Sequence, residues 1–378
     1  MSKIDFNTIP SPCFVLDEAA LRRNLELIDR VQREAGVTVI LALKGVAMIG
    51  AFPMVREYLK GCSVSSLNEA RLAAEFHRGE LHAYCPVYME QDFAALSGLC
   101  HKLTFNSLAE YARYRDRCAG KSVGLRINPG FSPVETALYN PCLPGSRFGI
   151  TADMLGDSLP AGIEGLHCHN LCESDSQALE KTLEEIERLF GRHLPLLKWL
   201  NLGGGHLMTC AGYDKDHLVR ILRQFRQRYP GLEIILEPGS AIGWQTGWLV
   251  STVLDRFTSG EVEMLMLDVS FACHMPDCLE MPYKPTVIGA HDARPGETAW
   301  RLGGCSCLAG DWVGQGDYAF DEPPQVGDRI VIEDMIHYTM VKTTMFNGIN
   351  LPSIGVWREA GQFELLKSFG YADYRSRL

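Results

Sequence analysis

Val37-Thr-Val-Ile-Leu-Ala-Leu-Lys44 is an unbroken apolar run that ends in a lysine. Its β-branched and aliphatic residues show no alternation, which is typical of a strand covered on both faces, as in a parallel sheet wrapped by helices. Lys44 would then stand where this strand leaves the core. Desolvation there favours the neutral amine, which can form a Schiff base with an aldehyde. The alternative is a lysine that extends its ammonium group from a strand end into solvent.

Strand-like and helix-like segments alternate on either side of this run. Asp17 has the position of an N-cap for a helix that ends at Gly36. Further strands are expected at residues 62–66, 81–86, 102–106, 122–128, 163–170, 197–203 and 232–237, and amphipathic helices at 67–77, 107–118, 176–189 and 214–229. With the first run these make eight strands in alternation with helices, which predicts a (β/α)8 barrel, because a doubly wound open sheet usually has fewer strands.

The texture of the chain changes after Gly239. Short strand-like pieces, separated by Gly, Pro and Asp, occur at residues 248–254, 264–267, 317–320, 328–333 and 338–342. This pattern predicts a second, mainly antiparallel β domain. We therefore expect a cofactor-binding barrel over residues 12–241 and a β domain over 242–378, which residues 1–11 could join.

Composition and charge narrow the classes of protein and partner. The net charge of -10 argues against a nucleic-acid partner and is compatible with a cationic substrate. No apolar stretch approaches the roughly 18 residues that a membrane span needs, and the N-terminus MSKIDFNTIPSP lacks the apolar core of a signal peptide. The 13 cysteines follow no repeating framework, which favours free thiols in a reducing compartment. A cytoplasmic protein is expected.

Polar residues collect at the C-terminal ends of the expected strands, where barrel enzymes carry their reactive groups. They are Lys44, Arg126 with Asn128, His167 with His169, Gly203-Gly204-Gly205-His206, and Glu237. The glycine triplet follows the seventh strand, where barrels often bind a phosphate. Pyridoxal phosphate fits this set, with an aldehyde for the lysine, an aromatic face for His169 and a ring nitrogen for Glu237. A carboxylate at that nitrogen keeps it protonated, which suits decarboxylation.

Other interpretations of single features remain open. The glycines can form a simple tight turn, and Glu237 can be a structural carboxylate. The cluster of His167, Cys168, His169 and Cys172 contains zinc-ligand types, but Cys168 points away from the two histidines on a strand, so we expect no metal. Cys305 and Cys307 can be a redox pair or ordinary turn cysteines, and Cys307 can also serve as a proton donor.

These residues, in this order, resemble the alanine racemase-like, fold-type III pyridoxal phosphate decarboxylases over essentially the whole chain. The resemblance implies that Lys44 carries the cofactor as an internal aldimine, His169 stacks on its ring, Gly203 to Gly205 bind its phosphate and Glu237 pairs with its ring nitrogen. Arg126 is expected among the cofactor-binding residues. Asp334-Met-Ile-His-Tyr338-Thr is similar to the segment whose tyrosine contacts the cofactor phosphate. Gly304-Cys-Ser-Cys307-Leu-Ala-Gly-Asp311 is similar to the loop that brings a proton-donating cysteine and a substrate-binding aspartate to the partner subunit.

Within this family the chain is most similar to the carboxynorspermidine (carboxyspermidine) decarboxylases. The similar stretches are 64–71, 169–173, 307–311 and, most specifically, His274-Met-Pro-Asp-Cys-Leu-Glu-Met-Pro-Tyr283. Two departures from the broader family matter. His169-Asn-Leu-Cys172 replaces a His-x-Gly-Ser stretch, and Ser240 stands where ornithine decarboxylase has a phosphate-binding arginine. Phosphate binding must then depend more on backbone amides, and ornithine becomes a doubtful substrate.

The resemblance implies a homodimer with shared active sites that converts carboxynorspermidine or carboxyspermidine into norspermidine or spermidine and carbon dioxide in polyamine biosynthesis. Carboxylates that could bind the substrate amines are Glu173, Asp268, Asp277, Glu280 and Asp311, with Glu173 and Asp311 preferred, although each can be structural. Alternatives are a decarboxylase of diaminopimelate, lysine or arginine, and a non-catalytic pyridoxal phosphate-binding regulator. A racemase is less expected, because that branch favours an arginine at the ring nitrogen.

Overall fold

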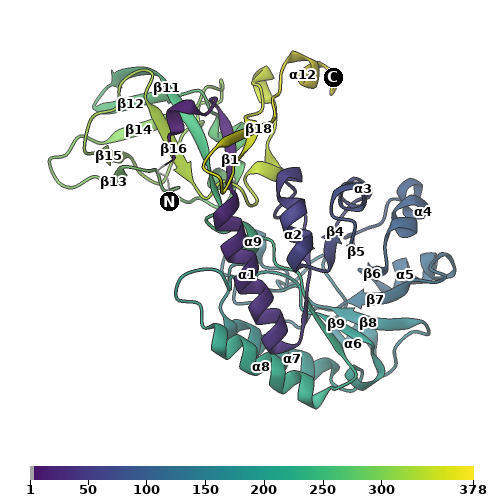
Figure 1. Cartoon of the computed structure of the whole chain (residues 1–378). Helices are drawn as coiled ribbons and strands as arrows, with labels where there is room; N and C mark the ends of the chain where they lie inside the picture. Colours follow the sequence, from purple (N-terminus) through teal and green to yellow (C-terminus); the bar gives the residue numbers. More distant parts are fainter. Residues whose placement is uncertain (1–3) are drawn as a thin grey trace. The chain divides into compact units, whose positions relative to one another are not determined.

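The computed structural model describes residues 4–378 (Figure 1). The chain divides into two compact units. One, the sheet unit, contains the N-terminal residues up to Arg22 together with Gly243–Leu378, and the other, the barrel unit, contains Arg23–Ile242. Within the described residues, no helix has the length and apolar character needed to cross a membrane.

The barrel unit is built on a single all-parallel sheet. Its strands within residues 4–378 are β2 (Thr38–Val39), β3 (Leu41–Ala42), β4 (Gly61–Val64), β5 (Glu80–Tyr84), β6 (Lys102–Phe105), β7 (Ser122–Arg126), β8 (Ile163–His167), β9 (Trp199–Asn201) and β10 (Glu233–Leu236). They follow one another in sequence order around the sheet, from β3 to β10 and then to β2. The predicted barrel is confirmed.

The run from Val37 to Lys44 closes this barrel. Its first half, β2, pairs with β10, and its second half, β3, pairs with β4. Between them the amide of Ile40 donates to the carbonyl of Leu236 at 2.9 Å, so hydrogen bonding to the last strand continues past the break. The apolar residues do not alternate with polar ones because β2 and β3 are covered on both faces, and they pair with β10 and β4.

The helix predicted to follow Asp17 is α1 (Glu18–Ala35). Asp17 Oδ1 accepts the amides of Ala19 at 2.9 Å and Ala20 at 3.1 Å, as an N-cap does. Gly36, with φ of +68°, follows the last helical residue in the left-handed conformation that ends many helices. Both predicted ends of this helix are confirmed.

The remaining helices of the barrel unit connect the strands (Figure 1). They are η2 (Ile49–Ala51), α2 (Phe52–Tyr58), α3 (Leu67–Phe76), α4 (Glu90–Leu99), α5 (Leu108–Tyr114), η3 (Arg115–Arg117), η4 (Ala137–Tyr139), α6 (Ala152–Leu155), α7 (Ser176–Phe190), η5 (Leu194–Leu196), α8 (Lys215–Arg228) and α9 (Ser240–Gly243). Side chains of Ser66, Ser107, Asp175 and Asp214 cap α3, α5, α7 and α8. These caps fix where each helix starts after its loop.

Trp199 fills the middle of the barrel. It packs with Ile40 and Ile235 in a buried apolar cluster. Two glycines make room for its indole, since a Cβ added at Gly165 would lie 2.0 Å from the ring and one at Gly124 2.2 Å from it. This close packing fills the space beside β7 and β8.

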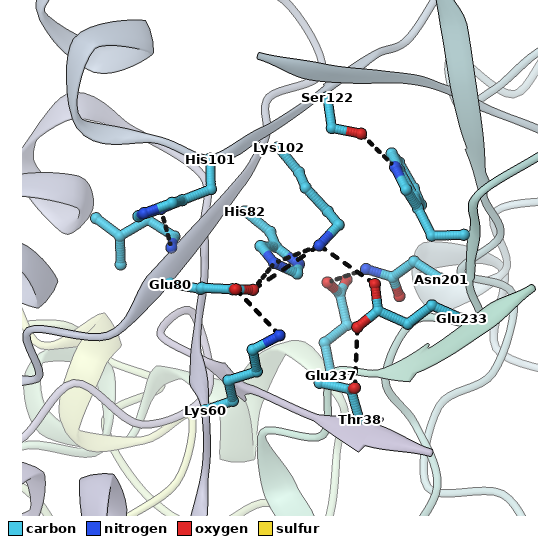
Figure 2. Close-up of polar contacts among 12 residues, drawn as sticks. Thr38, Lys60, Glu80, His82, His101, Lys102, Ser122, Asn201, Glu233 and Glu237 are labelled. Atoms are coloured by element: carbon cyan, nitrogen blue, oxygen red, sulfur yellow. Dashed lines mark hydrogen bonds and ion pairs between the residues drawn. The ribbon is translucent and has the colours of Figure 1, made fainter. Parts of the chain in front are cut away.

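A network of charged side chains lies at the start of the barrel strands (Figure 2). Glu80 pairs with Lys60 at 3.0 Å, and Lys102 lies 3.4 Å from Glu233 and 3.8 Å from Glu80. The imidazole Nε2 of His82 lies 3.4 Å from Glu80 Oε2. Contacts between opposite charges offset the cost of their partial burial. This end of a barrel usually contributes stability, whereas catalysis takes place at the opposite end.

The sheet unit contains β1 (Cys13–Asp17), β11 (Gly247–Ser259), β12 (Val262–Leu267), β13 (Ala290–Asp292), β14 (Trp300–Gly303), β15 (Tyr318–Phe320), β16 (Arg329–Glu333), β17 (Ser353–Trp357) and β18 (Phe363–Lys367). Its short helices are η1 (Phe6–Thr8), α10 (Phe271–His274), α11 (Pro276–Glu280), η6 (Met340–Lys342), η7 (Phe346–Gly348) and α12 (Tyr371–Arg375). The pairs β1–β17 and β12–β14 are parallel and the other pairs are antiparallel. The predicted mainly antiparallel domain is confirmed.

One predicted strand of this domain is wrong. Residues 338–342 form a turn and the helix η6. Tyr338 has φ of +54°, in the left-handed region, and the amide of Thr339 donates to the carbonyl of His337 at 2.6 Å. Such local closure is incompatible with an extended ladder. The β-branched and aromatic residues of this segment therefore reflect burial and not strand pairing.

Candidate active site

Side chains from several strands meet at the C-terminal end of the barrel. Lys44 follows β3, Arg126 ends β7, His167 ends β8 with His169 two residues on, Asn201 ends β9 before Gly203 to Gly205, and Glu237 follows β10. All of them belong to the barrel unit. The structure thus places the predicted barrel residues where this fold carries active sites.

Lys44 and His169 form the first contact of the site. Lys44 Nζ lies 3.0 Å from His169 Nε2, and the amide of Gly204 lies 2.8 Å from His169 Nδ1. A backbone amide can only donate, so Nδ1 accepts and the proton of a neutral imidazole is on Nε2. That proton faces Lys44, which can accept it only as a neutral amine. The geometry therefore presents Lys44 in the form that attacks an aldehyde.

The electrostatics of the site agree with this assignment. Burial lowers the pKa of Lys44, an effect that the carboxylate of Glu237 opposes. Burial and the charges of Lys44 and Arg126 hold the pKa of His169 well below its ordinary value. Both shifts are in the direction that favours the neutral form of each side chain.

Glu237 is buried, and both of its carboxylate oxygens are occupied. His167 Nε2 lies 3.0 Å from Oε1, and Asn201 Nδ2 donates to Oε2 at 3.0 Å. Burial raises the pKa of Glu237, but the charge and the hydrogen bond of His167 lower it further than burial raises it. Burial lowers the pKa of His167 against the opposing effect of Glu237. The lowered pKa of Glu237 favours its anionic form, and both of its oxygens then accept hydrogen bonds.

The glycine triplet approaches the rest of the site closely. Gly203 and Gly205 have φ of +70° and +89°, and a Cβ at Gly203 would lie 2.5 Å from His169 Nδ1. No other residue type fits this turn without displacing His169. The amides of Gly203 and Gly204 donate to Asn201 and His169. Within residues 4–378 the Gly205 amide has no hydrogen-bond partner, so it is the one that can donate to a phosphate.

Arg126 is buried between two aromatic rings. Its guanidinium lies 4.7 Å from the ring centroid of Tyr84 and 4.3 Å from that of Phe148. Its Nη2 donates to the carbonyl of His169 at 2.8 Å. These contacts fix the guanidinium beside the strand end that carries His169. Arg126 thereby adds a positive charge to the site.

Sequence reasoning missed two residues of the site. Asn201 is a lone polar residue in an apolar strand, which is the signal that could have identified it. Glu69 was hidden by its local pattern, because it stands in the first turn of α3, where Ser66 Oγ accepts its amide at 3.2 Å and its own Oε2 accepts the amide of Ser65 at 2.5 Å. Burial raises the pKa of Glu69, and the charge of Lys44 opposes this rise, which places the carboxyl within electrostatic reach of the lysine.

The sheet unit carries the predicted loop residues. Cys307 is exposed, and its amide donates to Asn347 Oδ1 at 2.8 Å. Asp311 is buried and accepts the amides of Ala272 at 2.9 Å and Ser306 at 3.0 Å. Both oxygens of Asp311 thus hold the local backbone, including the loop that leads to Cys307.

Two further predicted carboxylates of this unit differ in how they are occupied. Asp268 accepts hydroxyl hydrogen bonds from Ser11 at 2.6 Å and Ser251 at 3.0 Å. Asp277 Oδ2 accepts the hydroxyl of Tyr283 at 2.7 Å, whereas its Oδ1 is buried and has no partner within residues 4–378. Asp277 can therefore accept a further donor.

Glu280, Glu173 and Tyr338 complete the predicted set. Glu280 pairs with Lys342 at 2.5 Å. Glu173, in the barrel unit, and Tyr338, in the sheet unit, have left-handed φ of +46° and +54°. Non-glycine residues adopt this conformation rarely, and such strain concentrates at functional sites.

The barrel, its lysine and its buried carboxylate define a class of enzyme. Residues 13–336 match the protein family described as "Pyridoxal-dependent decarboxylase, C-terminal sheet domain". The chain belongs to this family, and the predicted family, enzyme class and cofactor are confirmed. Several relatives carry more particular names. The chain is 57% identical over 374 residues to the carboxyaminopropylagmatine decarboxylase of Synechocystis sp., covering 98% of this chain and 96% of that protein.

Two Campylobacter jejuni comparisons agree with the resemblance stated from the sequence. The chain is 41% identical to that organism's carboxynorspermidine/carboxyspermidine decarboxylase, over 98% of this chain and 99% of that protein. The crystal structure of its carboxynorspermidine decarboxylase complexed with norspermidine superposes with a TM-score of 0.91 at 40% identity, covering 98% of this chain and all of that one. Diaminopimelate decarboxylase from Helicobacter pylori shares the fold, with a TM-score of 0.82 at 16% identity.

The residues present fit pyridoxal phosphate. A neutral lysine amine suits its aldehyde, and an anionic carboxylate suits its protonated ring nitrogen. The turn of Gly203 to Gly205, where any Cβ would meet neighbouring atoms, leaves a backbone amide for its phosphate. Each group is supplied by a different strand of one barrel end.

Proposed function

We propose that this enzyme removes the α-carboxylate from a carboxylated polyamine, with pyridoxal phosphate attached at Lys44. One observation carries the proposal: Lys44 Nζ lies 3.0 Å from His169 Nε2 at the barrel end that also carries the buried carboxyl group of Glu237. The relatives support the substrate class, since the Synechocystis and Campylobacter proteins are named as decarboxylases of such compounds. Carboxynorspermidine and carboxyspermidine are the first candidates.

The barrel residues would hold the cofactor at four places. Lys44 would bind the aldehyde carbon, His169 would lie on the ring, Glu237 would face the ring nitrogen, and the turn of Gly203 to Gly205 would bind the phosphate. Arg126 is proposed to support the same site through His169. Tyr338 is proposed as a phosphate ligand from the family resemblance alone.

When bound, pyridoxal phosphate supplies an electron-poor ring that takes up the electron pair released as carbon dioxide leaves Cα. Glu237 holds a proton at the ring nitrogen, which strengthens that effect. Lys44 would hold the cofactor until the substrate amine takes its place, and its own amine would then be free to carry a proton. The Lys44 amine or the Cys307 thiol then returns a proton to Cα.

The cationic tail of the substrate requires carboxylates. Glu173 is the first candidate, because it stands in a strained turn of the barrel unit. Asp277 is the second, because its buried Oδ1 has no partner within residues 4–378. We rank Glu280, Asp268 and Asp311 lower, since each already accepts hydrogen bonds or pairs within its own unit.

The Synechocystis relative favours a second candidate substrate, carboxyaminopropylagmatine. That compound ends in a guanidinium group, whereas carboxyspermidine ends in a primary ammonium group. A carboxylate can bind a guanidinium through two parallel hydrogen bonds and an ammonium through one. The same acidic residues could therefore serve either substrate, with the far end of the pocket selecting between them.

We also propose a cytoplasmic homodimer with shared active sites. The exposure of Cys307 supports this, because a proton donor for a buried carbon cannot remain in solvent. The other subunit would supply the surface that covers it. A mixture of Lys44→Ala protein and Cys307→Ala protein should be more active than either variant alone, because a hybrid dimer has one complete site. A mixture no more active than the two variants measured separately would contradict shared sites.

A substrate panel tests the proposed function. Purified protein is incubated with pyridoxal phosphate and carboxynorspermidine, carboxyspermidine, carboxyaminopropylagmatine, diaminopimelate, lysine, arginine or ornithine, and carbon dioxide release is measured. We expect release from at least one carboxylated polyamine and none from the Lys44→Ala control. Release only from a smaller amino acid would refute the substrate class. Tight cofactor binding with no release from any compound would instead indicate a regulator.

A further inference from the structure

Asn201 connects two parts of the cofactor site. It is the last residue of β9 and is 4% exposed. Its Nδ2 donates to Glu237 Oε2 at 3.0 Å, and its Oδ1 accepts the amide of Gly203 at 2.8 Å. Figure 2 shows the amide of Asn201 directed at the carboxylate of Glu237. One side chain thus contacts both the ring-nitrogen carboxylate and the first glycine of the phosphate turn.

The orientation of this amide is fixed by its partners. Gly203 offers an N–H, which can only donate, so the oxygen of Asn201 must face it. The Nδ2 of Asn201 then faces Glu237 and donates to Oε2, which must offer a lone pair. The reverse orientation would bring two donors together at Gly203 and two acceptors together at Glu237. A buried site does not tolerate such unpaired groups.

A third hydrogen bond completes a closed ring. The amide of Glu237 donates to the carbonyl of Gly203 at 2.9 Å. Asn201, Gly203 and Glu237 are therefore joined pairwise, by two side-chain contacts and one backbone contact. A displacement of Glu237 must therefore move Gly203, and a displacement of Gly203 must move Glu237.

The groups around Glu237 do not replace this connection. Titratable side chains with an electrostatic effect on Glu237, or affected by it, are His167, His169, Lys44, His82 and His206. The Nε2 of His167 contacts Oε1, and its Nδ1 has no hydrogen-bond partner within residues 4–378, so this ring does not take over the role of Asn201. The charge and the hydrogen bond of His167 oppose the rise of the Glu237 pKa that burial causes.

We propose that Asn201 is a positioning residue that keeps Glu237 an anionic acceptor and ties it to the phosphate turn, so that the two ends of the cofactor are held at a fixed separation. This inference rests on the proposed cofactor site. Asn201 acts through Glu237 and Gly203 and does not itself react.

Asn201→Asp is the informative substitution, because it keeps the shape of the side chain. The acceptor for Gly203 remains, but a carboxylate oxygen now faces Glu237 Oε2, and two adjacent carboxylates must share a proton. We expect the dissociation constant of pyridoxal phosphate, measured by fluorescence on the apo-protein, to rise roughly tenfold or more. The absorbance of the bound cofactor should gain a transition between about pH 5 and 8 that the wild-type protein lacks.

The double variant Asn201→Asp, Glu237→Gln separates positioning from charge. A glutamine amide can donate to the new aspartate, which restores the pair with its polarity reversed. The loss of cofactor affinity caused by Asn201→Asp should be much smaller in the Glu237→Gln background than in the wild-type background, and the new pH transition should be absent from the double variant. An equal loss of affinity in both backgrounds would overturn the proposal, and the comparison of the double variant with Glu237→Gln alone decides the matter if Asn201→Asp does not fold.

Asn170→Asp is the matched structural control. Asn170 is also buried, and its Nδ2 donates to the carbonyl of Phe131 and to Thr182 Oγ1, both at 2.9 Å. This control should lower the melting temperature without creating the pH transition. The same transition in Asn170→Asp, or none in Asn201→Asp, would overturn the inference alone. A wild-type protein that binds no pyridoxal phosphate would refute the proposed function as well.

Discussion

Gly165→Ala tests the packing around Trp199 in the barrel. The added methyl carbon would lie 2.0 Å from Trp199 Cε2, 2.1 Å from Cδ2 and 2.5 Å from Cε3. The indole is 2% exposed, and its Nε1 donates to Ser122 Oγ at 2.8 Å, so it cannot move aside freely. Backbone or ring must therefore shift by more than an ångström.

The expected cost follows from these contacts. Overpacking a dense core by one methyl group costs about 1 to 3 kcal/mol, and three ring atoms at such short distances place this case at the upper end. Replacing glycine by alanine by itself raises the free energy of unfolding by about 0.5 to 1 kcal/mol, because the unfolded chain becomes less flexible. The free energy of unfolding of the barrel should fall by about 2 kcal/mol.

Urea unfolding followed by far-ultraviolet circular dichroism measures this change. Gly98→Ala is the control, since a Cβ at Gly98 meets nothing within 4 Å, and it should be neutral or slightly stabilising. In a Trp199→Leu background most of the cost of Gly165→Ala should disappear. A Gly165→Ala protein as stable as the wild type, or an equal cost in both backgrounds, would refute the account of the barrel interior.

Three further substitutions test other contacts. The hydrogen bond from His82 lowers the pKa of Glu80 to about 2, against the effect of burial. Glu80→Gln should therefore lower the free energy of unfolding at pH 7 by about 1 to 2 kcal/mol, after allowance for solvent screening. That difference should persist above the ordinary carboxyl pKa and vanish as the pH falls toward 2, and a pH-independent difference in urea unfolding would contradict it. Asp311→Ala should lower the free energy of unfolding by about 2 to 4 kcal/mol. It should also speed hydrogen exchange of the two backbone amides that donate to Asp311, and unchanged exchange would exclude its structural role. Asp17→Ala should lower helix stability by about 1 kcal/mol in a thermal melt, and an unchanged melt would count against the cap.

The barrel could be predicted because its information is local. The run from Val37 to Lys44 reports burial on both faces, and Asp17 and Gly36 mark the ends of α1 by capping chemistry. The sheet unit depends on distant pairing instead. β1 was not predicted, because it is defined by its partners, with Cys13 opposite Val250 and Ser353. No local pattern encodes such pairs.

The site shows the same division between local and distant information. Lys44, His169 and Glu237 could be named because each stands at a strand end, and parallel strands bring such ends together. Sequence spacing does not reveal that Ser11 donates a hydrogen bond to Asp268. It also does not reveal the left-handed turn at Tyr338. The contacts of a polar side chain are therefore harder to predict than its place on a strand.

The most direct test of the account is to find which lysine binds the cofactor. The protein is incubated with pyridoxal phosphate, reduced with borohydride and digested, and the modified peptide is identified by mass spectrometry. The account predicts a pyridoxyl group on Lys44, none on the partly buried Lys102, and loss of the stable adduct in Lys44→Ala. A stable adduct on another lysine, with Lys44 unmodified, would contradict it.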